Sequence, residues 1–173
     1  MRSIYFLMVI LLMAHVSGMA QSSVQKDAII RKKMVSLMRK PIKDSDTLDF
    51  NFMLDTSRIE ITEEVYLEGE LNDFAMRDLS NQAGRSYDEL LNKYYKKLSG
   101  KLNETNRAVL IRTQKAWIAY RDEELKLFGT IDEASNGGGG TAATIGLASI
   151  YRTLTKQRTI DLFNYYKDLV NHY

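Results

Sequence analysis

Residues 142–171 read AATIGLASIYRTLTKQRTIDLFNYYKDLVN, and this stretch decides the fold class of the chain. Apolar and aromatic side chains recur along it at helical spacing, with a single arginine among them. The positions of this stripe are Leu147, Tyr151, Leu154, Arg158, Leu162, Tyr165 and Leu169. The pattern predicts a long amphipathic helix that packs against other helices.

The stretch before this helix predicts a second long helix and a loop. Asn103 is a suitable N-cap, and a set of large side chains follows at helical spacing as far as Gly129. The members of this set are Leu110, Trp117, Tyr120, Leu127 and Phe128. Four consecutive glycines, 137–140, then form the clearest loop of the chain, because glycine favours no regular element.

Shorter helices are expected on either side of residues 81–85, whose sequence NQAGR indicates a break. Ser86 is the expected N-cap of a helix that ends near Gly100. Thr62 is the expected N-cap of a helix that runs to about Leu79. Its apolar face would consist of Leu67, Leu71 and Phe74.

The N-terminal part of the chain gives mixed signals. Residues 24–39 predict a short amphipathic helix that ends before Pro41, the only proline. Alternating apolar residues over 48–54 are typical of a strand, but no partner strand is evident. We therefore expect residues 44–61 to form a partly extended connector. Together these patterns predict an all-α fold, a small bundle of about four to five helices with a glycine-rich loop before the last long helix.

The first 20 residues have the layout of a cleavable signal peptide. Arg2 precedes an apolar run from Ile4 to Val16, and small residues lead up to Ala20. The run is too short for a comfortable membrane span, which needs roughly 20 residues. We expect cleavage after about Ala20 and a periplasmic or secreted product without stable membrane insertion. An uncleaved N-terminal anchor is the alternative.

Composition excludes several chemistries. The chain has no cysteine and only two histidines, one of them inside the expected signal peptide. A histidine-based catalytic triad, a cysteine nucleophile and a Cys/His zinc site are therefore absent. Glu63-Glu64 and Glu123-Glu124 are adjacent pairs that diverge on a helix, whereas glycosidase carboxylates must converge. We predict no enzymatic activity, no metal and no cofactor.

Charge is distributed unevenly along the chain. Residues 26–43 carry seven Lys or Arg and one acid, whereas residues 44–78 carry eleven acids and two arginines. The acidic segment either folds onto its basic neighbours or presents an acidic surface to a cationic partner. The basic segment is brief and lacks interleaved aromatic residues, which argues against a nucleic-acid partner.

Three segments of the chain form a recognisable order of motifs. They are L-N-x-x-Y-x-x-L at 91–98, Q-x-A-W-x-x-Y-R-D at 114–122 and L-T-x-x-R at 154–158, with the glycine loop between the last two. This order resembles the LprI-like lysozyme-inhibitor domain family. The motif residues are Gln114, Trp117, Tyr120, Arg121, Asp122, Leu154, Thr155 and Arg158. The resemblance implies a small exported helical domain, assigned to residues 62–173, that follows an N-terminal extension of residues 21–61.

The family usually carries disulfide cysteines, which this chain lacks. The corresponding positions are Phe74, Leu125 and Ile150. The resemblance implies that Leu125 and Ile150 contact each other in place of a bridge.

The function that the resemblance implies is binding and inhibition of lysozyme, a basic enzyme with a substrate cleft. The glycine loop would enter the cleft, and the acidic segment would face the positive charge of lysozyme or another cationic protein. The residues expected to contact such a partner are Gly137, Gly138, Gly139, Gly140, Glu63, Glu64, Glu68 and Glu70. Binding of a small anionic or cell-wall-derived ligand and a purely structural envelope role are the alternatives.

Three motif residues have two interpretations each. Trp117 is either a core aromatic residue or an exposed interface anchor. Arg121 and Arg158 either pair with an acid inside the bundle or converge on the anionic ligand of the second hypothesis. The candidate acids are Asp122, Glu124 and Asp161.

Overall fold

The computed structural model describes residues 23–39, 47–68, 71–137 and 139–171. The expected signal peptide, Pro41, Glu70 and Gly138 lie outside these residues. Within them the chain forms helices and no strand, as the all-α prediction requires.

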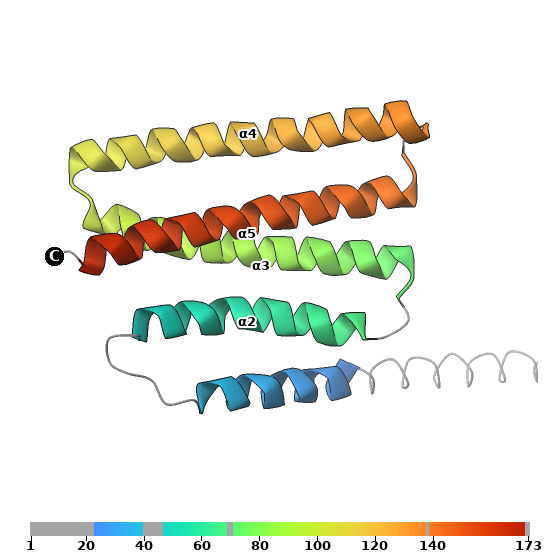
Figure 1. Cartoon of the computed structure of the whole chain (residues 1–173), viewed down its shortest axis with the longest axis horizontal. Coiled ribbons are helices and arrows are strands. Elements are labelled where there is room, and N and C mark those ends of the chain that lie inside the picture. Colours follow the sequence, from blue (N-terminus) through green and yellow to red (C-terminus); the bar gives the residue numbers. More distant parts are fainter. Residues whose placement is uncertain (1–22, 40–46, 69–70, 138, 172–173) are drawn as a thin grey trace, which may run out of the picture.

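The described residues form five helices that run roughly side by side (Figure 1). A helix over residues 23–38 is followed by α2 (Thr47–Leu67), α3 (Asp73–Lys101), α4 (Glu104–Asn136) and α5 (Thr141–Asn171). The closest pair is α3 and α5, which run next to each other through the middle of the bundle. α2 packs on α3, α4 packs on α5, and the 23–38 helix lies beyond α2.

The core lies where α3 meets α5, near the α3–α4 connection. Its buried side chains are Leu90, Leu91, Tyr94, Leu98, Leu110, Leu162 and Phe163. α2 closes one side of this core with Phe52, whose ring stacks on Phe163 at 3.9 Å and meets Tyr94 edge-on at 5.2 Å. α4 contributes Leu110 and the half-buried Trp117 from the other side.

Several predicted helix ends are confirmed. The Asn103 side chain accepts a hydrogen bond from the backbone N–H of Asn106 at 2.9 Å and so caps α4. The predicted glycine loop also begins where α4 ends, at Gly137 in the left-handed conformation with φ of 77°, although the helix itself was expected to end near Gly129. The 23–38 helix and the last long helix agree with their predicted limits to within a residue at each described end.

The predicted connector over 44–61 is wrong, because residues 47–67 form α2. Leu48, Phe52 and Ile59 pack against the core from one side of this helix. The apolar residues at 48–54 fit the two-residue period of a strand, but Leu48 and Phe52 are also four residues apart, as on one face of a helix. The segment is helical over the whole of α2. Thr62 is no N-cap either: it lies inside α2, and its hydroxyl donates to the Arg58 carbonyl at 2.7 Å.

The predicted break at 81–85 and the predicted cap at Ser86 are also wrong, because α3 continues through both. Gly84 is a packing residue. A Cβ atom built there would lie 2.7 Å from Cδ1 of Tyr151 on α5. The missing side chain allows α3 and α5 to approach closely in their middle.

Some apolar stripes are placed differently from the prediction. α4 continues past Gly129 to Asn136. Five side chains expected to face inward are exposed: Leu67, Phe74, Tyr120, Leu127 and Tyr165. On α5 the fully buried positions include Thr155 and Thr159 beside Leu162. The hydroxyls of both threonines donate to carbonyls one turn earlier, which removes the cost of burying them.

None of the described helices has a stretch long and apolar enough to cross a membrane.

Candidate functional site

Motif residues of α4 and α5 meet around the indole ring of Trp117. The Arg121 guanidinium carbon lies 5.3 Å from the Trp117 ring centroid, and that of Arg158 lies 6.0 Å from it. Gln114, one turn before Trp117, accepts a hydrogen bond from Nε of Arg158 at 3.0 Å. Two segments far apart in sequence therefore form one cluster of cation–π and polar contacts.

Arg121 is held by several partners inside this cluster. Its Nε and Nη2 donate to Asp122 Oδ1 at 3.0 and 2.7 Å. Its guanidinium also lies 5.3 Å from the ring centroid of Tyr151 on α5. Asp122 is one of the acids that the sequence offered as a partner. With its charge paired and both aromatic contacts made, Arg121 holds α4 against α5.

Arg158 has fewer partners. Its relative exposure is only 6%, and its Nη2 atom is buried without a hydrogen-bond acceptor among the described residues. Burial lowers the pKa of Arg158, and the nearby Asp161 and Tyr165 oppose this shift. A buried donor without an acceptor carries a desolvation cost of about 1–3 kcal/mol. Arg158 is the part of the motif whose bonding the bundle leaves incomplete.

The other motif residues have simpler positions. Thr155 is buried, and its hydroxyl donates to the Tyr151 carbonyl at 2.7 Å. Leu154 is half-buried, whereas Tyr120 and Asp122 are exposed. Leu125 and Ile150, the positions of the family's cysteines, are both half-buried on the paired helices α4 and α5, and Phe74 is exposed.

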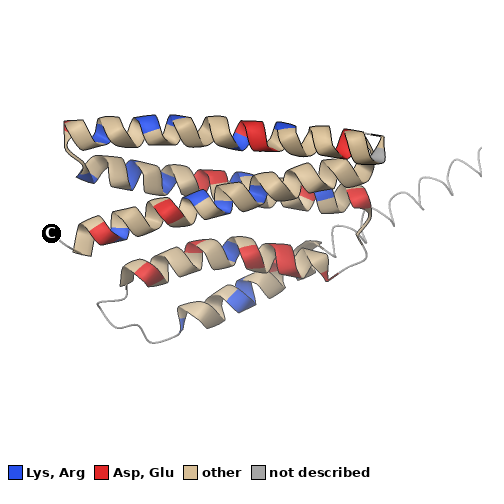
Figure 2. Ribbon diagram, turned by 45° about the horizontal axis from the view of Figure 1, so that its top comes forward, with Lys and Arg blue, Asp and Glu red and all other residues tan. Residues whose placement is uncertain are grey.

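The acids of α2 and the residue after it are paired with cations from other helices. Four of these ion pairs have N–O distances of 2.5–3.0 Å, the Asp55–Lys93 pair is shorter, and the Glu68–Lys33 pair measures 3.8 Å. The pairs are Asp49–Lys167, Asp55–Lys93, Glu60–Lys156, Glu63–Arg152, Glu64–Lys33 and Glu68–Lys33. Glu63 is only 7% exposed, whereas Glu64 and Glu68 are exposed to solvent. In Figure 2 several red segments lie along α2, and blue segments occur on the neighbouring helices.

Two buried tyrosines, Tyr87 and Tyr94, extend this network. The Tyr87 hydroxyl donates to Glu60 Oε1 at 3.2 Å, and the Tyr94 hydroxyl donates to Asp55 Oδ2 at 3.2 Å. Desolvation raises the pKa of each phenol first, and the adjacent carboxylate raises it further. Both partners lie on the segment expected to be a connector, so their contacts were not predictable without α2.

The glycine loop connects the end of α4 to the start of α5 at one end of the bundle (Figure 1). Gly137 and Gly139 have φ of 77° and 73°, which only glycine adopts readily. A Cβ atom built at either residue or at Gly140 would meet nothing within 4 Å. In Figure 1 this loop lies at the same end as the last turn of α2 and the first turn of α3.

Acidic residues occur beside the loop. Asp132 and Glu133 lie in the last turns of α4, and the ribbon of Figure 2 is red near this end of α4. Glu68 follows α2, and Asp73 begins α3. The loop end of the bundle is therefore rich in negative charge.

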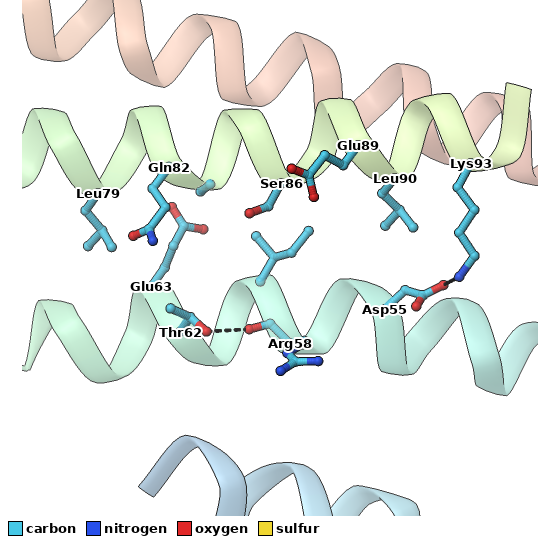
Figure 3. A pocket seen from close by; sticks show the side chains of 12 residues that line it. Asp55, Arg58, Thr62, Glu63, Leu79, Gln82, Ser86, Glu89, Leu90 and Lys93 are labelled. Atoms are coloured by element: carbon cyan, nitrogen blue, oxygen red, sulfur yellow. Dashed lines mark hydrogen bonds and ion pairs between the residues drawn. The ribbon is translucent and has the colours of Figure 1, made fainter. Parts of the chain in front are cut away.

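A cleft of about 480 Å³ separates α2 from the middle of α3 (Figure 3). Gln82 and Ser86 extend from α3 toward α2, and the apolar Leu79 and Leu90 extend from the same helix on either side of them. The Asp55–Lys93 pair marks one end of the cleft and Glu63 lies near the other. This arrangement has space for a small polar ligand, but it contains no nucleophile activated by a neighbouring base.

No part of the described chain gathers three or more His, Asp or Glu side chains in a geometry that could hold a metal ion. The arrangement offers surfaces and grooves for binding, and ion pairs that hold the helices together.

The fold and site define a small helical domain in which the Trp117 ring of α4 contacts both Arg121 of the same helix and Arg158 of α5. Comparison with protein families identifies this class more closely. The family model described as lysozyme inhibitor LprI matches residues 68–162, more than half of the chain. The chain belongs to the LprI lysozyme-inhibitor family. No curated protein and no solved structure matches it.

Proposed function

We propose that this protein is an exported, non-enzymatic inhibitor of lysozyme that acts in the periplasm or outside the cell. Membership of the LprI family over residues 68–162 is the observation that carries this proposal. The apolar run that precedes Ala20 supports export by a cleaved signal peptide.

The loop end of the bundle is the proposed contact surface. The space around Gly137, Gly139 and Gly140 is open, which suits contact with a substrate cleft. The surroundings of the loop carry negative charge from Asp132, Glu133 and Asp73, which would attract a basic enzyme. Glu64 and Glu68 add to this charge only in part because Lys33 pairs with both, and Glu63 is engaged by Arg152.

Lysis of a cell-wall suspension by lysozyme, measured with and without the purified protein, tests the proposal. We expect dose-dependent inhibition that weakens as salt rises, because exposed charges are screened. Deletion of Gly138 and Gly139, or Glu133→Lys, should reduce inhibition at least tenfold. Glu123→Lys is the matched control, because it makes the same charge change at an exposed position of α4 that lies fourteen residues before Gly137.

Two results would overturn the proposal. Absence of inhibition toward chicken-type and other lysozyme classes at micromolar protein would remove the function and leave only the family membership. Inhibition unaffected by the loop variants would retain the function and move the contact surface elsewhere.

Binding of a small anionic ligand is the second candidate function. The observation that favours it is the buried Nη2 of Arg158, which lacks an acceptor. Arg121 does not share this property because Asp122 already pairs with it. The candidate therefore depends on Arg158.

A further inference from the structure

We propose that a groove between α4 and α5 binds an amphipathic carboxylate, with the carboxylate on Arg158 and the alkyl chain along the apolar walls. This inference deepens the anionic-ligand candidate and is independent of lysozyme inhibition. The groove lies toward the α3–α4 connection, at the opposite end of the bundle from the glycine loop (Figure 1).

The groove is built from three helices and is largely apolar. Its volume is about 360 Å³, which is within the range of small-molecule sites. Leu98 and Leu102, from the end of α3 and the residue after it, together with Leu110 of α4, supply its deep apolar surface. Val109 of α4 and Leu169 of α5 extend that surface outward, and an alkyl chain would bury this surface and its own.

Arg158 supplies the only cationic side chain of this lining. It is 6% exposed, it forms no ion pair in the described part of the chain, and its Nη2 lacks an acceptor. Gln114 accepts only from Nε, so the fork of the guanidinium remains incompletely bonded. A carboxylate is the planar acceptor that best matches this fork.

The combination defines the ligand class. An apolar groove alone would accept any hydrophobic molecule, and a surface arginine alone would accept any anion. A desolvated arginine in the wall of an apolar groove selects molecules that carry both features. Tyr165 and Asn106, which also line the groove, are polar groups at its sides.

Calorimetric titration of the full chain with decanoate below its micelle concentration tests the proposal. Decanol and decyltrimethylammonium are the neutral and cationic probes of equal chain length. We expect decanoate to bind at least tenfold more tightly than decanol and decyltrimethylammonium not to bind. Affinity should rise about fourfold for each methylene from hexanoate to decanoate, because about 0.8 kcal/mol is gained per buried CH₂.

Two variants separate the carboxylate site from general hydrophobic binding. Arg158→Gln should abolish the preference for decanoate over decanol, and Arg121→Gln, which removes the paired arginine outside the groove, should retain it. Because Arg158→Gln is buried and could impair folding, Val109→Glu provides a second test. Val109 is 46% exposed, so glutamate is tolerated there and repels a carboxylate. Ile118→Glu, on the same helix and exposed, is its control.

Equal affinity for decanoate and decanol, or unchanged decanoate binding in folded Arg158→Gln or Val109→Glu protein, would overturn the proposal. Deletion of Gly138 and Gly139 should leave decanoate binding unchanged, and Val109→Glu should leave lysozyme inhibition unchanged. Failure of one function therefore does not imply failure of the other.

Discussion

Two glycines within helices fix how closely α5 approaches its neighbours. Gly84 of α3 faces Tyr151, and Gly146 of α5 faces Phe128, whose ring would lie 2.5 Å from an added Cβ. At both positions an aromatic ring occupies the space of the missing side chain. Gly84 was interpreted from sequence as part of a helix break, whereas the structure shows that it and Gly146 are packing positions within helices.

Gly84→Ala should lower the free energy of unfolding by about 1–2 kcal/mol. Overpacking against the ring of Tyr151 costs about 1–3 kcal/mol, and the better helix propensity of alanine offsets at most about 1 kcal/mol. Urea unfolding followed by circular dichroism measures the change. Gly100→Ala is the matched control: it lies in the same helix with nothing within 4 Å of an added Cβ, and it should stabilise the protein. Stabilisation by both changes would contradict the packing role of Gly84.

The buried tyrosines predict an alkaline limit of stability. The folded state raises the pKa of Tyr87 and Tyr94, so below about pH 10 both phenols keep their protons whether the chain is folded or unfolded. Above that pH the unfolded chain loses these protons and the folded chain retains them, so the free energy of unfolding must fall. Urea midpoints between pH 8 and 11.5 measure this loss. The double variant Tyr87→Phe, Tyr94→Phe should show a smaller decline, and an equal decline would exclude these phenols as its source.

At the scale of elements, α2 is fastened by charges as well as by its apolar side. The two kinds of ion pair differ in burial: Glu63–Arg152 is largely buried, and Glu64–Lys33 is exposed. Breaking a buried pair leaves a desolvated charge behind, whereas an exposed partner is rehydrated.

Glu63→Gln should therefore lower the free energy of unfolding by about 1–3 kcal/mol, because Arg152 then lacks its carboxylate. Glu64→Gln, at the next position, should change it by less than about 0.5 kcal/mol. Thermal and urea unfolding of both variants at low and high salt provide the comparison. Similar effects of the two changes would mean that the burial of Glu63 contributes no extra stability.

The long helices with clear caps and stripes were predictable from sequence, whereas the packing between them was not. Asn103 and the glycine run carry local signals, so α4 begins and α5 follows where expected. The break assigned to Gly84 depended on a neighbour 67 positions later, Tyr151, which no local pattern reveals. For the candidate site, the motif predicted that Arg121 and Arg158 either pair with acids or bind an anionic ligand. Asp122 was among the candidate acids, but the sequence did not show that it would pair with Arg121 or that Arg158 would form no ion pair within the described residues.

At the scale of the whole molecule, the region before the family match is part of the core. The family model begins at residue 68, but Phe52 of α2 stacks on Phe163, and Val65 is 1% exposed. The predicted boundary between residues 61 and 62 falls inside α2. α2 therefore acts as a structural part of the bundle, although its sequence lies outside the matched domain.

A truncated chain of residues 72–173 should accordingly lose cooperative folding or melt far below the full chain. Without α2 the rings of Tyr94 and Phe163 face water, and the burial of Phe52, Ile59 and Val65 is lost. Each such side chain contributes about 1.5–3 kcal/mol, so the sum approaches the 5–15 kcal/mol by which a domain is usually stable. The near-ultraviolet circular dichroism of the tyrosines and the melting temperature report the effect.

Removal of residues 1–39 alone is the control for this truncation. The described part of the 23–38 helix buries only Met34, so the shortened chain should keep a cooperative transition at a modestly lower temperature. If residues 72–173 instead unfold cooperatively within a few degrees of the full chain, α2 is an appendage and its ion pairs serve another purpose. If the 40–173 chain collapses as completely as the 72–173 chain, the 23–38 helix stabilises the bundle through more than its one buried side chain. The two truncations together locate the smallest unit that folds, and hence the smallest protein on which lysozyme inhibition and carboxylate binding can be measured.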